Sequence, residues 1–138
     1  MLRPGLFFVA GFLAVLCFHQ PVFALLHGYG VIPVAPFSTA PTQPLGVPVW
    51  LSAAFWGGVW GMVMLNLLRW EASKPQPWLK GLLFGGIALT TVALLVVFPL
   101  KGMGFNAAQL PVRFAIGFLV NAAWGVGTLI FARTLLAR

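Results

Sequence analysis

Four runs of about twenty residues without Asp, Glu, Lys or Arg make up most of this chain. The first extends from Gly5 to Leu26, and the others cover residues 47–68, 81–100 and 114–132. An α-helix rises about 1.5 Å per residue, so each run is long enough to cross the roughly 30 Å hydrocarbon core of a bilayer. The runs therefore predict an all-α integral membrane protein built as a four-transmembrane-helix bundle.

The composition agrees with this prediction and excludes a soluble domain. Of the 138 residues, 61% are hydrophobic and 7% are charged, whereas soluble domains are about half apolar and one quarter charged. We expect a single transmembrane domain over residues 1–138. Its predicted parts are spans at about 5–27, 47–69, 79–100 and 112–135, a proline-rich outer loop at 28–46 and a cytoplasmic turn at 70–78.

The basic residues, which give a net charge of +7, lie at the ends of the predicted spans. Cytoplasmic loops of membrane proteins collect Lys and Arg, so their distribution predicts orientation. One side of the bundle would carry Arg3, Arg69, Lys74, Lys80, Arg133 and Arg138, and the other side only Lys101 and Arg113. We therefore expect both termini in the cytoplasm, a bacterial inner membrane as the location, and contact of these residues with lipid rather than nucleic acid.

The first run has a second interpretation as a cleaved signal peptide. Arg3 would be its charged start, and Val22-Phe23-Ala24 would be its small-x-small cleavage site. A signal peptide has an apolar core of about 7 to 15 residues, which is shorter than this run. The length therefore favours a retained span.

Small residues predict how the helices meet. In the first span they recur at alternating spacings of four and three, which is typical of a seam between closely approaching helices. On this seam Gln20 flanks the contact, and His19 points away from it toward a further helix, a second copy or a ligand. The residues expected at helix contacts are Ala10, Ala14, Cys17, Ala24, Gly57, Gly58, Gly61, Gly81, Gly85, Gly117 and Gly125.

Two short resemblances between the halves of the chain suggest an internal repeat. The segment that begins at Gly5 resembles the one at Gly81, and the segment that begins at Ala53 resembles the one at Asn121. If the repeat is structural, it predicts two helical hairpins related by an axis along the membrane normal.

A few polar or aromatic side chains fall at similar depth in the outer half of the predicted membrane. They are His19, Gln20, Trp56, Thr90, Thr91 and Asn121. Counted along the helices they lie within about two turns of one another. Such a layer can be a hydrogen-bonded lock between helices, a polar pocket or pore, or a site for haem, quinone or pigment through His19.

The residue types exclude most catalytic sites within one chain. Glu71 is the only acid, so paired-carboxylate catalysis, a Ser-His-Asp triad and carboxylate-rich metal sites are not available. His19, His27 and Cys17 lie on one predicted helix, which does not supply a zinc site. We therefore expect no enzyme activity, no metal and no resident cofactor.

These observations predict an accessory or self-associating subunit of a membrane complex, whose partners are the bilayer and its own copies or other membrane subunits. The alternatives are a small oligomeric channel or transporter that uses the polar layer, and a haem-, quinone- or pigment-binding redox subunit that uses His19. The proline-rich loop, residues 28–46, is either a lid over the outer end of the bundle or a plain connector.

Overall fold

The computed structural model describes residues 2–43, 45–103 and 106–137, and within these residues it contains helices and no strand. Four helices are long and apolar enough to cross a membrane: Arg3–Gly28, Val49–Leu67, Trp78–Leu100 and Ala107–Leu136. The predicted helical architecture with four such helices is therefore confirmed. We refer to them as the first to fourth long helices.

Two of the long helices contain π-helical segments. The first consists of α1 (Leu2–Ala14), the π-helical η1 (Val15–His19) and α2 (Gln20–Gly28). The second is α3 (Val49–Leu67). The third consists of α4 (Trp78–Leu83), π-helical η2 (Phe84–Leu89), α5 (Thr90–Val92), π-helical η3 (Ala93–Val97) and α6 (Phe98–Leu100). The fourth starts with the 3₁₀ turn η4 (Ala107–Gln109) and continues as α7 (Leu110–Leu136).

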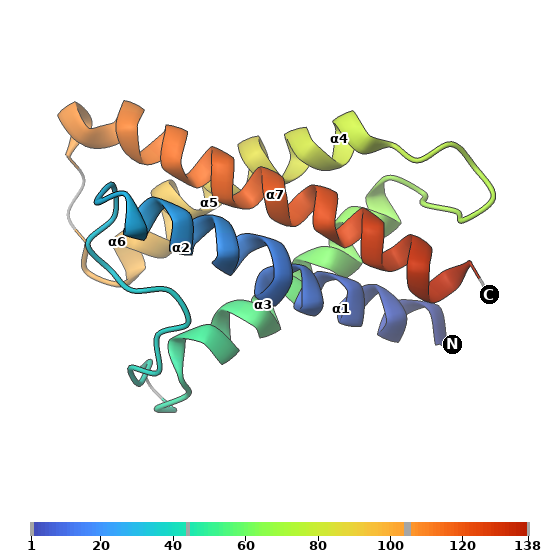
Figure 1. Cartoon of the computed structure of the whole chain (residues 1–138), viewed down its shortest axis with the longest axis horizontal. Coiled ribbons are helices and arrows are strands. Elements are labelled where there is room, and N and C mark those ends of the chain that lie inside the picture. The colour runs from blue at the N-terminus through green and yellow to red at the C-terminus, as the bar shows by residue number, and fades with distance from the viewer. Residues whose placement is uncertain (1, 44, 104–105, 138) are drawn as a thin grey trace.

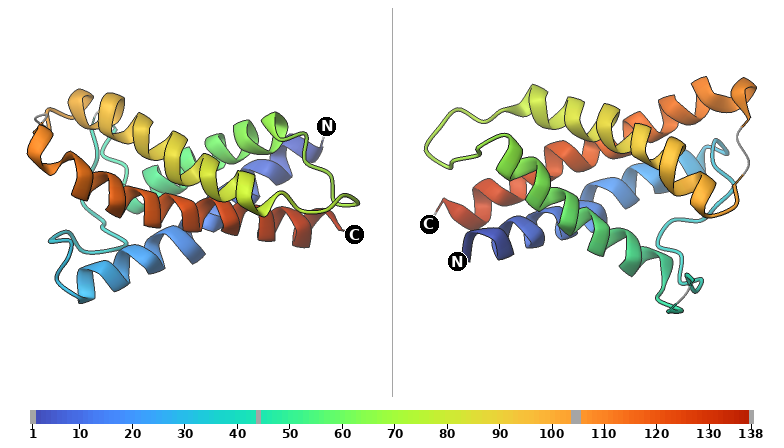
Figure 2. Two further views of the ribbon diagram at one scale, coloured as in Figure 1. Left: turned by 90° about the horizontal axis from the view of Figure 1, so that it is seen from above. Right: turned by 180° about the vertical axis from the view of Figure 1, so that it is seen from behind.

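The long helices form two layers (Figure 1). The first long helix and α7 make one layer, and α3 and the third long helix make the other, which faces the viewer in the right-hand view of Figure 2. α1 packs against both α3 and α7, and the third long helix packs against α7. Between α3 and the third long helix, the rings of Trp60 and Phe84 approach with centroids 6.4 Å apart. The second layer is therefore held mainly by the first layer.

Glycines bring two pairs of neighbouring helices into backbone contact. A Cβ atom on Gly11 would collide with the carbonyl oxygen of Gly57 and lie 2.9 Å from the Cα of Gly61. On the other side of the bundle, a Cβ on Gly85 would collide with the carbonyl oxygen of Asn121. A side chain at either glycine would force the helices apart, as expected for small residues at membrane-helix interfaces.

The seven glycines expected at helix contacts each lie against an atom of another long helix. They are Gly57, Gly58, Gly61, Gly81, Gly85, Gly117 and Gly125. The repeat corresponds only partly to this packing. Gly57 and Gly125, which the repeat aligns, both meet the backbone of a neighbouring helix, whereas Gly5 meets nothing within 4 Å and its counterpart Gly81 packs on Leu129.

The predicted seam of the first long helix is correct only as far as Ala14. Ala10 and Ala14 are fully buried, whereas Cys17 is exposed and Ala24 lines a hollow on the outside of the bundle. The cause is η1, in which the N–H of Gln20 bonds to the carbonyl of Val15, five residues back. The extra residue in this turn rotates everything beyond it by about 100° relative to a continuous α-helix. The prediction that Cys17 packs between helices was therefore wrong, and the one for Ala24 stays a prediction.

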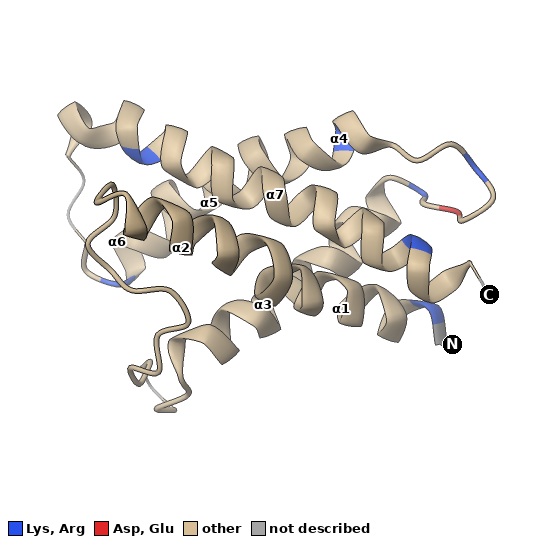
Figure 3. Ribbon diagram, viewed as in Figure 1, with Lys and Arg blue, Asp and Glu red and all other residues tan. Residues whose placement is uncertain are grey.

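The charged residues of the described chain lie mainly at the two ends of the bundle (Figure 3). Arg3, Arg69, Lys74, Lys80 and Arg133 belong to the end that contains both termini and the turn between α3 and α4. The other end has Lys101 and Arg113. Arg3 also donates a hydrogen bond to the carbonyl of Trp70, which ties the start of α1 to the chain beyond α3. Arg138 lies outside the described residues.

Candidate functional site

A cavity of about 180 Å³ lies between α3 and the third long helix, and residues of the first long helix and α7 complete its lining. We call it the central cleft. Its polar and aromatic lining residues are His19, Trp56, Trp60, Asn121 and Trp124. The aliphatic lining residues are Val15, Ala53, Leu89, Val92, Ala93 and Val97. The cleft therefore has an apolar lining with a few polar groups, as is typical of small-ligand sites.

A chain of hydrogen bonds orients His19 at this cleft. The backbone N–H of Phe37, in the proline-rich loop, donates to Oε1 of Gln20 over 2.7 Å. This bond identifies the other end of the Gln20 amide as the NH₂ group, and that group lies 3.3 Å from Nδ1 of His19. Nδ1 then accepts, so the neutral imidazole carries its proton on Nε2. The ring therefore retains one N–H donor, at Nε2.

Asn121 supplies a second oriented polar group. Its Nδ2 donates to Oγ1 of Thr90 over 3.1 Å, joining α7 to α5. Thr90 is 1% exposed, so the bond is well shielded. One N–H of the amide is used in this way, so the side chain retains Oδ1, a hydrogen-bond acceptor, and the second N–H of Nδ2.

Two tryptophans of the cleft differ strongly in exposure. Trp124 is 1% exposed, and its indole N–H donates to the carbonyl of Gly11 over 3.1 Å. Trp56 is 56% exposed and packs edge-on against Phe55. Trp124 is thus part of the packed interior, whereas Trp56 forms an accessible side of the cleft.

Parts of all three π-helical segments meet at this cleft. Val15 and His19 come from η1, Leu89 from η2, and Ala93 and Val97 from η3. In two cases a proline follows closely, since η1 ends two residues before Pro21 and η3 ends two residues before Pro99. π-helical turns are rare in proteins, and those that occur are often found at functional sites. Their convergence marks the central cleft as the candidate site.

The structure brings together five of the six residues of the predicted polar layer. His19, Trp56 and Asn121 line the cleft. Gln20 is hydrogen-bonded to His19, and Thr90 is hydrogen-bonded to Asn121. Thr91 is exposed and does not line the cleft. His19 was predicted to point away from the seam toward a further helix, a second copy or a ligand, and it lines the cleft together with residues of α3 and the third long helix.

The sequence pattern missed Trp60, Trp124 and the aliphatic residues that line the cleft. Trp56 and Trp60 are four positions apart on α3, a spacing that places two side chains on one helix face. That spacing is a usable signal for the aromatic side of the cleft. The aliphatic residues carry no such signal, because apolar residues occupy every face of these helices.

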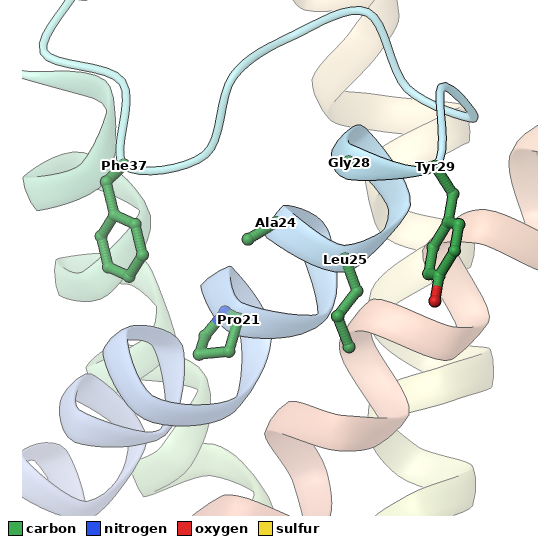
Figure 4. Close-up of a pocket in the computed structure, with 6 residues that line it drawn as sticks. All are labelled: Pro21, Ala24, Leu25, Gly28, Tyr29 and Phe37. Carbon is green, nitrogen blue, oxygen red and sulfur yellow. The ribbon is translucent and has the colours of Figure 1, made fainter.

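A second, broader hollow of about 680 Å³ lies beside α2 under the proline-rich loop (Figure 4). It is lined by Pro21, Ala24, Leu25, Gly28, Tyr29 and Phe37. The loop is fixed at both sides of this hollow, since Nδ1 of His27 lies 2.8 Å from the carbonyl oxygen of Ile32 and Gln20 accepts from Phe37. Phe37 itself has a positive φ of 49°, which is uncommon for a non-glycine residue. The loop therefore has a defined path across the end of the bundle.

In the charged turn, residues 70–78, Glu71 forms an ion pair with Lys74, three residues further along the chain. Nζ of Lys74 lies 2.8 Å from Oε1 of Glu71, and the hydrogen bond and charge of Lys74 lower the pKa of that carboxyl group. In the part of the chain that the structure describes, no three His, Cys, Asp or Glu side chains are grouped so that they could hold a metal ion.

Comparisons of this chain with protein-family models, with curated proteins and with solved structures find no match.

Proposed function

We propose that this chain is a multi-pass protein of a bacterial inner membrane, with four crossing helices and both termini in the cytoplasm. The length and apolarity of the four long helices support the first part. The distribution of charge supports the orientation, because the end with the termini has five described basic residues and the opposite end has two.

Within the membrane we propose a role as an accessory or self-associating subunit without catalytic chemistry of its own. The observation that carries this proposal is the central cleft. His19 and Asn121 line this cleft at the side of the bundle, within the apolar length of the helices. Next to them is Trp56, which is 56% exposed. Polar side chains at this depth are costly against hydrocarbon and usually face protein, water or a ligand. The face is therefore suited to being covered by something other than lipid chains.

A transport path through a single chain has less support. Trp124, Met64, Leu65 and Leu129 are fully buried side chains that fill the interior around α1. A path of the kind expected of a small channel would then have to run between copies of the chain. The geometry thus favours an assembly over a pore within one subunit.

Purification from native membranes in mild detergent, followed by native mass spectrometry, tests the proposed role. We expect a complex with further copies of the chain or with a stoichiometric foreign membrane subunit. Trp56→Ala should reduce the amount of complex, whereas Leu119→Ala, on a similarly exposed residue of α7, should not. A monomer at every protein concentration, together with no cross-linked partner in intact membranes, would contradict the proposal.

The orientation has its own test in a variant in which Cys17 is replaced by Ser. A cysteine in place of Ser38, in the proline-rich loop, should react with a membrane-impermeant maleimide added to spheroplasts. A cysteine in place of Ser73, in the charged turn, should react only after the membrane is broken. The reverse pattern would overturn the proposed orientation.

A further inference from the structure

We propose that the central cleft binds the headgroup of a membrane-soluble phenol or quinol, a single six-membered ring with hydroxyl oxygen and an apolar tail. The tail would leave the cleft between α3 and the third long helix. This inference rests on the proposed membrane location, but it does not depend on the proposed association with other subunits.

The volume of the cleft matches a ligand headgroup with a single ring. Its volume is about 180 Å³, and an engineered apolar cavity of about 150 Å³ in another protein is large enough to bind benzene. A haem is several fused rings wide and does not fit this volume, nor does a helix with its side chains. Trp56 and Trp60 provide aromatic surface against which a flat ring can pack.

The hydrogen-bond donor that His19 brings to the cleft is set by residues that do not line the cleft. Phe37 donates to Gln20, Gln20 donates to Nδ1 of His19, and the remaining N–H of the neutral ring is at Nε2. An imidazole held in one tautomer in this way can donate to a ligand oxygen. The proline-rich loop thus acts on the cleft through Gln20, although none of the loop residues that the structure describes lines the cleft.

The acceptor in the cleft is fixed by α5. Asn121 donates its Nδ2 to Thr90 and presents Oδ1. One donor and one acceptor together complement a hydroxyl group, which both accepts and donates. A quinone carbonyl only accepts, so it would use His19 or the second N–H of Asn121 and leave Oδ1 of Asn121 without a donor. The cleft should therefore prefer the reduced, hydroxyl-bearing ring.

The π-helical segments that line the cleft favour its interpretation as a binding site over that as an accidental gap between helices. Residues of η1, η2 and η3 line it, and each π-helical segment inserts one extra residue into its helix. Such insertions interrupt regular helix packing and are retained where they serve a purpose. Three of them at one cavity point to selection for its shape.

The test uses the purified full chain in lipid nanodiscs with decyl-1,4-benzoquinol as the probe, under anaerobic conditions. Binding is measured by the quenching of tryptophan fluorescence. We expect saturable binding, and about tenfold weaker binding of the oxidised decyl-1,4-benzoquinone, which corresponds to one lost hydrogen bond. His19→Ala and Asn121→Leu should each weaken quinol binding by a similar factor.

A filled-cleft variant supplies the steric control. Ala93 lines the cleft, so Ala93→Phe should abolish saturable binding, whereas Ala115→Phe, on an exposed residue of α7, should leave it unchanged. Ala53→Phe places the same ring on the α3 side and replaces Ala93→Phe if that variant does not fold. Near-ultraviolet circular dichroism of each variant establishes that its fold is intact.

Cross-linking of the native protein gives a second measurement that needs no variant. A decyl-tailed azidophenol should attach to residues of α3 and the third long helix that line the cleft. Attachment spread evenly over the apolar surface, unsaturable quenching, or equal binding by Ala93→Phe and the native chain would overturn the inference. The oligomeric state of the same sample separates the two proposals, because a monomer that binds quinol would contradict only the association.

Discussion

Trp124 donates its indole N–H to the backbone carbonyl of Gly11, 113 positions earlier in the chain. The bond is 3.1 Å long and buried, and it joins α7 to α1 at the point where Gly11 also meets Gly57 of α3. Three long helices are therefore held together around one glycine.

Trp124→Phe should destabilise the protein by at least about 1 kcal/mol, the amount expected for the loss of a hydrogen bond between membrane helices. Phe is smaller than the indole that it replaces, so the space left at this buried position adds to the loss of the N–H donor. Reversible unfolding in mixed micelles with increasing sodium dodecyl sulfate measures the difference. Trp78→Phe, on a tryptophan that is 41% exposed, serves as the control and should change little.

Gly11→Ala should be more damaging than its single added methyl group suggests. The new Cβ would collide with the Gly57 carbonyl, so the helices must separate, at a cost of about 1 to 3 kcal/mol. Gly5→Ala, on the same helix, has open space around it and should be neutral or stabilising by up to about 1 kcal/mol. The same unfolding titration compares the two, and equal effects would show that close packing at Gly11 is not what matters.

Asn121→Ala and Thr90→Val should be coupled, because each removes one partner of the same 3.1 Å hydrogen bond. The double variant should be more stable than the sum of the two single losses predicts, by about 0.5 to 1.5 kcal/mol. A double-mutant cycle of unfolding free energies measures this term. A value of zero would mean that Asn121 is not bonded to Thr90 in the folded protein.

Gln20→Leu should release the proline-rich loop near Phe37, because the loop loses the acceptor for the Phe37 N–H. Hydrogen exchange of that amide should become at least tenfold faster, corresponding to the loss of about 1.4 kcal/mol of protection. Gln43→Leu, on an exposed glutamine of the same loop, is the matched control. If both variants exchange like the native chain, the loop is held by other contacts.

The carboxyl group of Glu71 should titrate below the ordinary glutamate range. Lys74 lowers its pKa by a hydrogen bond and by its charge, so the charged form is favoured in the folded protein. This stabilising contribution is present above the ordinary pKa and is lost as the pH falls through the lowered one. Because Glu71 is the only acid, glutamate labelled with ¹³C at the side-chain carboxyl carbon gives one side-chain signal, and Lys74→Met should move its midpoint upward.

The sequence was sufficient for the helical architecture and for most contacts made by small residues. Glycine positions are informative because few other residues permit backbone contact, so Gly57, Gly61 and Gly85 could be assigned from spacing alone. Asn121 is four residues from both Gly117 and Gly125 on one helix face, and a buried amide in an apolar helix needs a partner, so its helix contact could be inferred in the same way.

The central cleft could not be located in the same way. Its position depends on α3 and the third long helix lying in the same layer while each packs mainly on the other layer, and apolar helices show no preferred face from which this order could be read. The π-helical turn at Val15–His19 was also missed. A proline such as Pro21 signals a bend in a helix, but the extra residue lies before it and changes which residues are buried.

The π-helical turn at Val15–His19 changes how the first long helix should respond to the deletion of one residue. Removal of one residue between Val15 and His19 would leave an uninterrupted α-helix of ordinary geometry. The segment beyond it would return to the ungapped register, so Gln20 would turn away from the loop that it anchors. A single codon deletion would thus turn α2 by about 100° about its own axis, with the helix before Ala14 left as it is.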